Sequence, residues 1–251
     1  MLRMKTPPTD DPQSGQAAVE AALTLPLTIF LILGTLQFFL LLQARTLTEY
    51  AAFRAVRTGS VKHGDCQAMT HAAIAALLPT FARTDTPEAL GRAFGRHNDN
   101  QHHGSGHTGP IVWLTRERPL RQDIRNDEEE SFDDPARYTS VRDVMRLESR
   151  LIFWFPMRIP FANWVLNRMF LARWGLRNYT AHNPLLLTET AHWNERSGAR
   201  FDAAIAQELV SRSNRREYVF PLQASYSMRM MTPARRTLFR TQNCEPTPEG
   251  L

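Results

Sequence analysis

The longest apolar stretch of the chain runs from Ala21 to Leu42 and contains no charged residue. A helix of about 20 such residues is long enough to cross the hydrocarbon core of a membrane. The pattern therefore predicts a membrane helix over residues 16–43. Pro26 lies near its start, where a missing amide hydrogen bond costs least. A cleaved secretory signal is not favoured, because the run is too long and no clear small-residue cleavage site follows it.

Helical spacing continues beyond the apolar run, with mixed polarity. Leu47, Ala51 and Ala55 recur at intervals of four, and an Ala-rich stretch follows after Cys66. We therefore predict a helical stalk over residues 44–82, with its second part interrupted at Pro79. The default role of these small apolar faces is core packing within the chain.

Residues 83–251 contain stretches with the helical spacing of apolar residues and stretches in which apolar and polar residues alternate as in strands. They therefore predict an α+β domain outside the membrane. The whole chain is thus expected to have a single transmembrane helix extended into a stalk, followed by helices and antiparallel strands. The last strand contains a proline, which places it near a sheet edge. Strands are expected at 109–117, 139–155 (or a helix in its first half) and 216–231, and helices at 162–174 and 198–212.

Two polar stretches interrupt this domain, near residues 96–109 and 122–137. The first is rich in Gly, Asn and Ser, and we interpret it as a flexible surface loop. The second contains an acidic cluster and is interpreted as a solvated loop. The first stretch also holds four histidines, which could bind a metal, but none of them pairs at i,i+4 on a predicted helix, so no metal site is predicted. These histidines are His97, His102, His103 and His107.

Charge, motifs and cysteine content disfavour several classes of function. The net charge is +5 without a dense basic block, so nucleic-acid binding is not favoured. No motif of a nucleotide, hydrolase or zinc site is present, and the proximity of Asp65 and His71 to Cys66 assigns no nucleophile to a base. We therefore expect neither catalysis nor a cofactor. Cys66 and Cys244 could form a disulfide in an oxidising compartment, and two free thiols are the alternative.

One carboxylate, Glu20, stands at the start of the apolar run. An acidic residue suits a helix N-terminus because it complements the exposed amide dipoles. A more specific interpretation uses Gly15, which precedes Gln16 and an apolar helix whose fifth residue is Glu20. This arrangement resembles the class III signal of type IV prepilins. The resemblance implies cleavage of a leader, residues 1–15, by a prepilin peptidase.

The same resemblance implies a role for Glu20 after cleavage. The α-amino group exposed on Gln16 of one subunit would neutralise the Glu20 carboxylate of its neighbour. Assembly would then relieve the cost of holding an ionised carboxylate in lipid. Glu20 is therefore the predicted assembly carboxylate, and the bond between Gly15 and Gln16 is the predicted processing site.

The wider stretch GQAAVEAALTLPLTIFLIL resembles the TadE-like family, the pseudopilins of the tight-adherence (Flp) pilus system. The features that carry the resemblance are Ala17-Ala18, Val19-Glu20, Ala21-Ala22 and Pro26. The resemblance implies a minor pseudopilin with one span in the bacterial inner membrane and residues 83–251 in the periplasm. Pilin-like subunits, the assembly machinery and the prepilin peptidase are the implied partners.

Two other functions remain open, and the flanking charges conflict with the implied orientation. The membrane helix could be only a tether for a periplasmic binding or sensor module. Alternatively, the chain could be a membrane-anchored enzyme that uses the His-rich loop and a metal. Basic residues alone would place the C-terminal side in the cytoplasm. They are Arg3 and Lys5 before the helix, and Arg45, Arg54, Arg57 and Lys62 after it.

Overall fold

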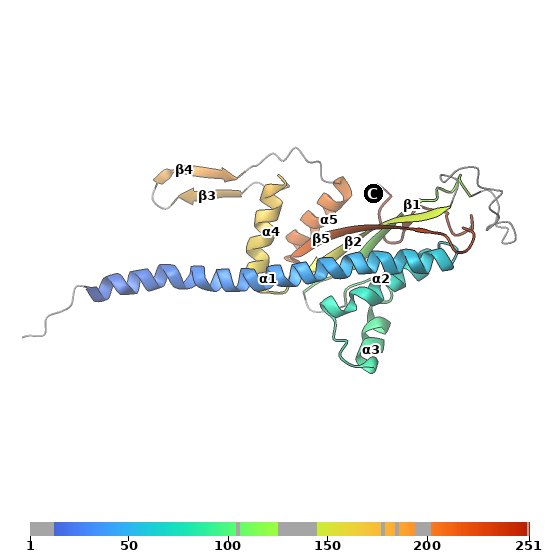
Figure 1. The fold of residues 1–251 in the computed structure, drawn as a ribbon. Coiled ribbons are helices and arrows are strands. Elements are labelled where there is room, and N and C mark those ends of the chain that lie inside the picture. The colour runs from blue at the N-terminus through green and yellow to red at the C-terminus, as the bar shows by residue number, and fades with distance from the viewer. Residues whose placement is uncertain are drawn as a thin grey trace, which may run out of the picture.

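The computed structural model describes residues 13–103, 106–124, 145–176, 179–183, 186–193, 202–249 and 251. For residues 13–17, 179–183 and 186–193 it describes the backbone alone. The described part of the chain begins with one long helix, α1 (Gln13–Val61), whose C-terminal half carries a mixed α/β head (Figure 1). The expected α+β class with a single long N-terminal apolar helix is confirmed.

Helix α1 is continuous over 49 residues, which corresponds to about 73 Å at 1.5 Å per residue. Pro26 lies inside this helix and does not end it. The hydroxyl groups of two threonines near Pro26 donate hydrogen bonds to backbone carbonyls one turn earlier in the helix. Thr24 donates to the carbonyl of Glu20 and Thr28 donates to the carbonyl of Thr24, each at 2.9 Å.

A tight turn separates α1 from α2 (Cys66–Phe81), which folds back along α1 (Figure 1). Gly64 takes φ +80° in this turn, and a Cβ there would lie 2.4 Å from the Phe239 ring. Its amide donates to the carbonyl of Gly59 at 2.8 Å, which satisfies an orphan carbonyl of α1. Asp65 then caps α2 by accepting from the Ala68 amide at 3.1 Å.

Helix α2 runs through Pro79 to Phe81, so the predicted interruption at Pro79 is wrong. A proline near a helix C-terminus removes one backbone hydrogen bond and leaves the later ones intact. The amide of Ala82 still reaches the carbonyl of Leu78 at 2.8 Å.

A third helix, α3 (Pro87–His97), follows and was not predicted. Thr86 caps it by accepting from the Ala89 amide at 3.1 Å, with a proline at the first helical position.

The head is built on an antiparallel sheet in the order β5-β2-β1-β6. Leu151 in the central strand lies opposite Leu114 on one side and Ala224 on the other. The predicted strands at 109–117 and 216–231 correspond to β1 and β5, and the proline-containing strand does lie at an edge. The bounds are β1 (Val112–Arg118), β2 (Arg146–Pro156), β5 (Val219–Arg229) and β6 (Asn243–Cys244).

Period-2 alternation along the strands divides the core between the two faces of the sheet. Leu147, Leu151 and Phe153 pack with the α1 and α2 side, whereas Ile152 and Trp154 pack on the opposite side. The opposite side is covered by α4 (Ala162–Arg173) and α5 (Ala203–Asn214), which correspond to the two predicted helices. The sheet is therefore the middle of three layers. A hairpin of β3 (Tyr179–Asn183) and β4 (Leu186–Trp193), which was not predicted, connects α4 to the segment before α5.

Candidate functional site

The N-terminal half of α1 carries the predicted processing and assembly residues on an exposed apolar surface. Every side chain from Ala18 to Ile29 is exposed, and Leu23 is 72% exposed. The most apolar 18-residue window has a mean hydropathy of 2.3, and only 11% of it is buried. A helix in the core of a soluble protein would be mostly buried, so α1 has the length and composition of a membrane anchor.

Glu20 lies on this surface with its side chain exposed. Its backbone carbonyl accepts from Thr24, but among residues with described side chains its carboxylate has no hydrogen-bond or ion-pair partner. Gly15 and Gln16 lie in the first turn of α1, whose backbone is helical from Gln13. Terminal turns fray readily, so the bond between Gly15 and Gln16 stands where a helix opens at least cost.

The far end of α1 is tied to the sheet by a disulfide between Cys66 and Cys244, with a Cα–Cα distance of 5.3 Å. Sequence reasoning left this pairing open, and the structure joins the two residues. Cys66 is the first residue of α2, and Cys244 belongs to β6. The bond therefore holds the two-residue edge strand against the α1–α2 turn. Cys66 is disulfide-bonded and Asp65 caps α2. These two neighbouring residues therefore provide no free thiol beside a base.

Arg116 reinforces the same junction, a role that sequence reasoning missed because a charged residue in a strand is usually solvated. Its guanidinium donates to the carbonyls of Gly64 at 2.6 Å and Leu238 at 3.0 Å, and also to that of Thr241. It also lies 4.0 Å from the centre of the Phe239 ring. Burial lowers the pKa of Arg116 to about 10. These contacts use the side chain to join the α1–α2 turn to the C-terminal segment.

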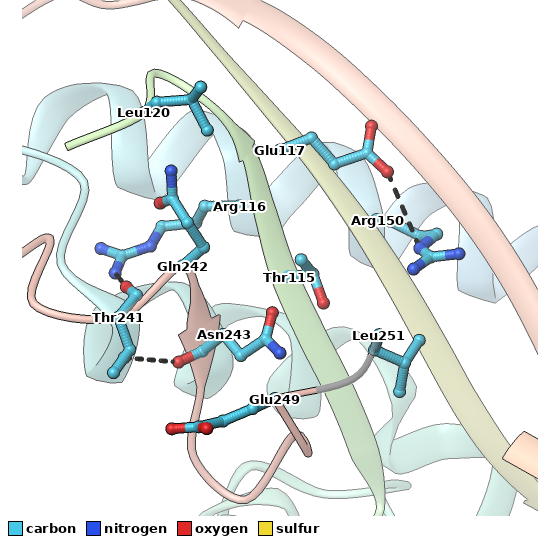
Figure 2. A pocket seen from close by; sticks show the side chains of 10 residues that line it. All are labelled: Thr115, Arg116, Glu117, Leu120, Arg150, Thr241, Gln242, Asn243, Glu249 and Leu251. Atoms are coloured by element: carbon cyan, nitrogen blue, oxygen red, sulfur yellow. Dashed lines mark hydrogen bonds and ion pairs between the residues drawn. The ribbon is translucent and has the colours of Figure 1, made fainter. Parts of the chain in front are cut away.

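A hollow of about 470 Å³ opens over β1, β2 and the C-terminal segment (Figure 2). Two of its charged groups, Glu117 and Arg150, form an ion pair, and the other polar contacts of its arginines are with Asp202 and with backbone carbonyls. Arg150 lies 3.7 Å from Glu117 and 3.0 Å from Asp202, and Arg116 is held by backbone carbonyls. This arrangement offers polar contacts but places no described nucleophile beside a base. The lining residues are Thr115, Arg116, Glu117, Leu120, Arg150, Thr241, Gln242, Asn243, Glu249 and Leu251.

The histidine-rich stretch differs from the flexible surface loop that the sequence predicted. His97 ends α3 and is buried, and Gln101 forms a bridge with Pro110. His102 is also buried, because its ring packs 5.2 Å from the centre of Phe81. Packing against Phe81 therefore buries both histidines, although the polar composition of this stretch predicted a solvent-exposed loop. The second predicted loop, 122–137, lies outside the described residues beyond position 124.

The four histidines lie near one another but do not converge on a point. The ring centres of His97 and His102 are 6.4 Å apart, as are those of His102 and His107. His103 instead lies 2.6 Å from the Asp99 carboxylate on the exposed side. Within the described part of the chain, no group of three or more His, Cys, Asp or Glu side chains is arranged to hold a metal ion.

His102 makes the stability of the head depend on pH. Burial, together with the positive charge of Arg212 and the neighbouring His107 and His97, lowers its pKa to about 3. In the unfolded chain the pKa returns to about 6.5, so below that pH the unfolded state binds a proton that the folded state excludes. Folding stability is therefore expected to decrease by about 2 kcal/mol from His102 alone between pH 7 and pH 5.

Denaturant unfolding of the full chain in detergent micelles, followed by tryptophan fluorescence, measures this loss. Replacing His102 with Leu should flatten the dependence on pH, whereas His103→Gln at the exposed position should leave it unchanged. Burial also lowers the pKa of His107, so a smaller slope of the same sign remains in the His102 variant. A wild-type stability that is constant from pH 7 to pH 5 would contradict the prediction.

Comparison with known proteins identifies the N-terminal segment. Residues 15–57 match the family model for TadE-like proteins, which confirms the resemblance over this part of the chain. The match covers the predicted processing site, Glu20 and most of α1, and ends before the α1–α2 turn. No curated protein and no solved structure matches the chain.

Proposed function

We propose that this chain is a membrane-anchored minor pseudopilin that contributes to assembly of a tight-adherence (Flp-type) pilus or a related secretion apparatus. The observation that carries the proposal is a coincidence in α1. The segment that matches the TadE-like family contains an exposed apolar stretch of α1, and among residues with described side chains the Glu20 carboxylate on this stretch has no partner. In this proposal α1 spans the bacterial inner membrane, and pilin-like subunits and the assembly machinery are the partners.

A periplasmic head is favoured over a cytoplasmic one by the Cys66–Cys244 disulfide. Disulfides persist in the bacterial periplasm and are rare in the reducing cytosol. The count of flanking basic residues favours the opposite orientation, but large domains are translocated largely regardless of such charges. We therefore give more weight to the disulfide.

A non-catalytic role is part of the proposal. It is supported by the structural contacts of polar and thiol side chains in the head that could otherwise take part in catalysis. Cys66 is bonded, Asp65 caps α2, and Arg116 holds backbone carbonyls together. A binding protein or an assembly subunit does not need these groups to be free for catalysis, so their structural contacts are compatible with either role.

The proposal is tested at the bond between Gly15 and Gln16. Mass spectrometry of the protein purified from its native membrane should give a mature chain that begins at Gln16. Gly15→Ala should leave the full-length chain uncleaved, because the prepilin peptidase would no longer find glycine before the scissile bond. Gly34→Ala is the matched control on the same helix, since a Cβ at Gly34 would meet nothing within 4 Å.

The result that counts against the proposal is equally specific. An intact N-terminus in cells with an active prepilin peptidase, together with normal pilus formation, would remove the pseudopilin assignment. A chain cleaved at Gln16 in wild type and Gly34→Ala, but not in Gly15→Ala, would support it.

A further inference from the structure

The inference concerns α4, which lies against the part of α1 that should be in the membrane. The hydrocarbon core is about 30 Å thick, and a straight helix needs about 20 residues to cross it. Every side chain from Ala18 to Ile29 is exposed, but this segment covers only about 18 Å at 1.5 Å per residue. The core must therefore also include the next turns of α1, where the head already makes contact.

Two contacts fix the head to these turns. The rings of Phe30 and Phe161 meet edge to face, with their centres 5.7 Å apart. Farther along α1, the side-chain oxygen of Gln37 accepts from the amide of Ile159 at 2.9 Å, and Gln37 is only 1% exposed. The head thus removes the polar end of Gln37 from a lipid-facing position. The segment that begins α4 accordingly shares the depth of Phe30 and Gln37 in the bilayer.

One end of α4 meets α1, and α4 runs away from α1 at a steep angle (Figure 1), so it lies roughly in the membrane plane if α1 follows the membrane normal. Four exposed residues at its start and along its length define what we call the α4 stripe: Phe161, which precedes the helix, and Trp164, Arg168 and Met169 within it; Arg173 at the end of α4 is exposed as well. Phe161, next to α1, is 51% exposed, and Met169 is exposed to the same extent. Phe161 also has φ +66°, an unfavourable value for a bulky residue, and this conformation accompanies its contact with Phe30.

The order of residue types along the stripe fits a lipid surface. The Phe161 and Trp164 rings stack, with centres 6.4 Å apart, and the Arg168 guanidinium lies 4.7 Å from the Trp164 ring centre. Tryptophan is enriched at the membrane interface, and arginine beside it can reach lipid phosphates while its stem remains in apolar surroundings.

We propose that the α4 stripe inserts into the head-side leaflet of the bilayer and holds the head against the membrane surface. The occupant of this apolar face is therefore phospholipid, with acyl chains around Phe161 and Trp164 and with the Arg168 side chain extending toward the phosphate groups. The inference rests on the part of the proposed function in which α1 spans the membrane, and it does not require the pilus assignment.

The test places the photo-crosslinking residue p-benzoylphenylalanine at Trp164 of the full chain in its native membrane. Leu31, a 66% exposed residue of α1, is the positive control for lipid contact. Leu90, a 41% exposed residue of α3, is the control for a position facing water. We expect phospholipid adducts at Trp164 at least about tenfold above those at Leu90, because interfacial aromatic residues contact lipid.

The outcomes separate this inference from the proposed function. Lipid adducts at Leu31 but only the Leu90 background at Trp164 would overturn the inference and leave the anchor standing. A second protein captured at Trp164 in place of lipid would also overturn it, and would assign the stripe to a neighbouring subunit. Absence of lipid adducts at Leu31 would remove the membrane anchor itself and the inference with it.

Discussion

Replacing Cys66 and Cys244 together with Ala is expected to lower the free energy of unfolding by about 5 kcal/mol, the loop-closure term for so distant a pair. The two residues are 178 positions apart, so their bond restricts almost the whole head in the unfolded state. The native state also depends on the bond, because β6 has two residues and pairs with β1 only through Leu114 and Thr115. Total stabilities of about 5–15 kcal/mol make such a loss severe.

Denaturant titration of the full chain in detergent micelles measures this effect. Reduction of the wild-type protein should shift its transition to that of the double variant, and reduction of the variant should change nothing. A difference below about 1 kcal/mol would show that the disulfide contributes far less than the entropy of closing its loop.

Glu20→Gln is expected to weaken association with pilin-like subunits by about 30-fold, which corresponds to about 2 kcal/mol for loss of a close charge pair. Within the described part of the chain its carboxylate has no partner, so an amine from another subunit would be its first ionic contact. Cleavage between Gly15 and Gln16 should continue, because the substitution leaves the scissile bond and the glycine before it unchanged.

Recovery of pilin-like subunits with the purified protein, normalised to the amount of processed chain, measures this association. Glu49→Gln is the matched control: Glu49 is also exposed on α1, but it already pairs with Arg45 at 3.5 Å. Unaltered association in Glu20→Gln would remove the proposed role of Glu20, whereas equal loss in both variants would indicate a general effect of charge on α1.

Much of the architecture could be predicted from the chain because it follows local periodicity. The uncharged run predicted the exposed part of α1, and the alternation in 216–231 with its proline predicted an edge strand. The start of α3 carried a readable signal as well, since Thr86 before Pro87 and Glu88 is a typical helix start. That signal was overlooked.

Other features depend on contacts that no local pattern contains. The strand β6 is too short for any periodicity, and it pairs only because the chain end returns to β1. Burial of His102 and Arg116 could not be read from neighbours that are mostly polar, because each is covered by residues distant in sequence. Gln37 lies within the uncharged apolar run, and no local pattern indicates that its side chain accepts a hydrogen bond from the backbone amide of Ile159.

The continuity of α1 has a mechanical consequence. No loop interrupts the helix between its exposed apolar end and the segment that packs on β2 and β5. If the proposed function holds, axial force that assembly machinery applies at the membrane would reach the sheet through this continuous helix, without a flexible joint between them. The head and the N-terminal part of α1 would then move together as one rigid body.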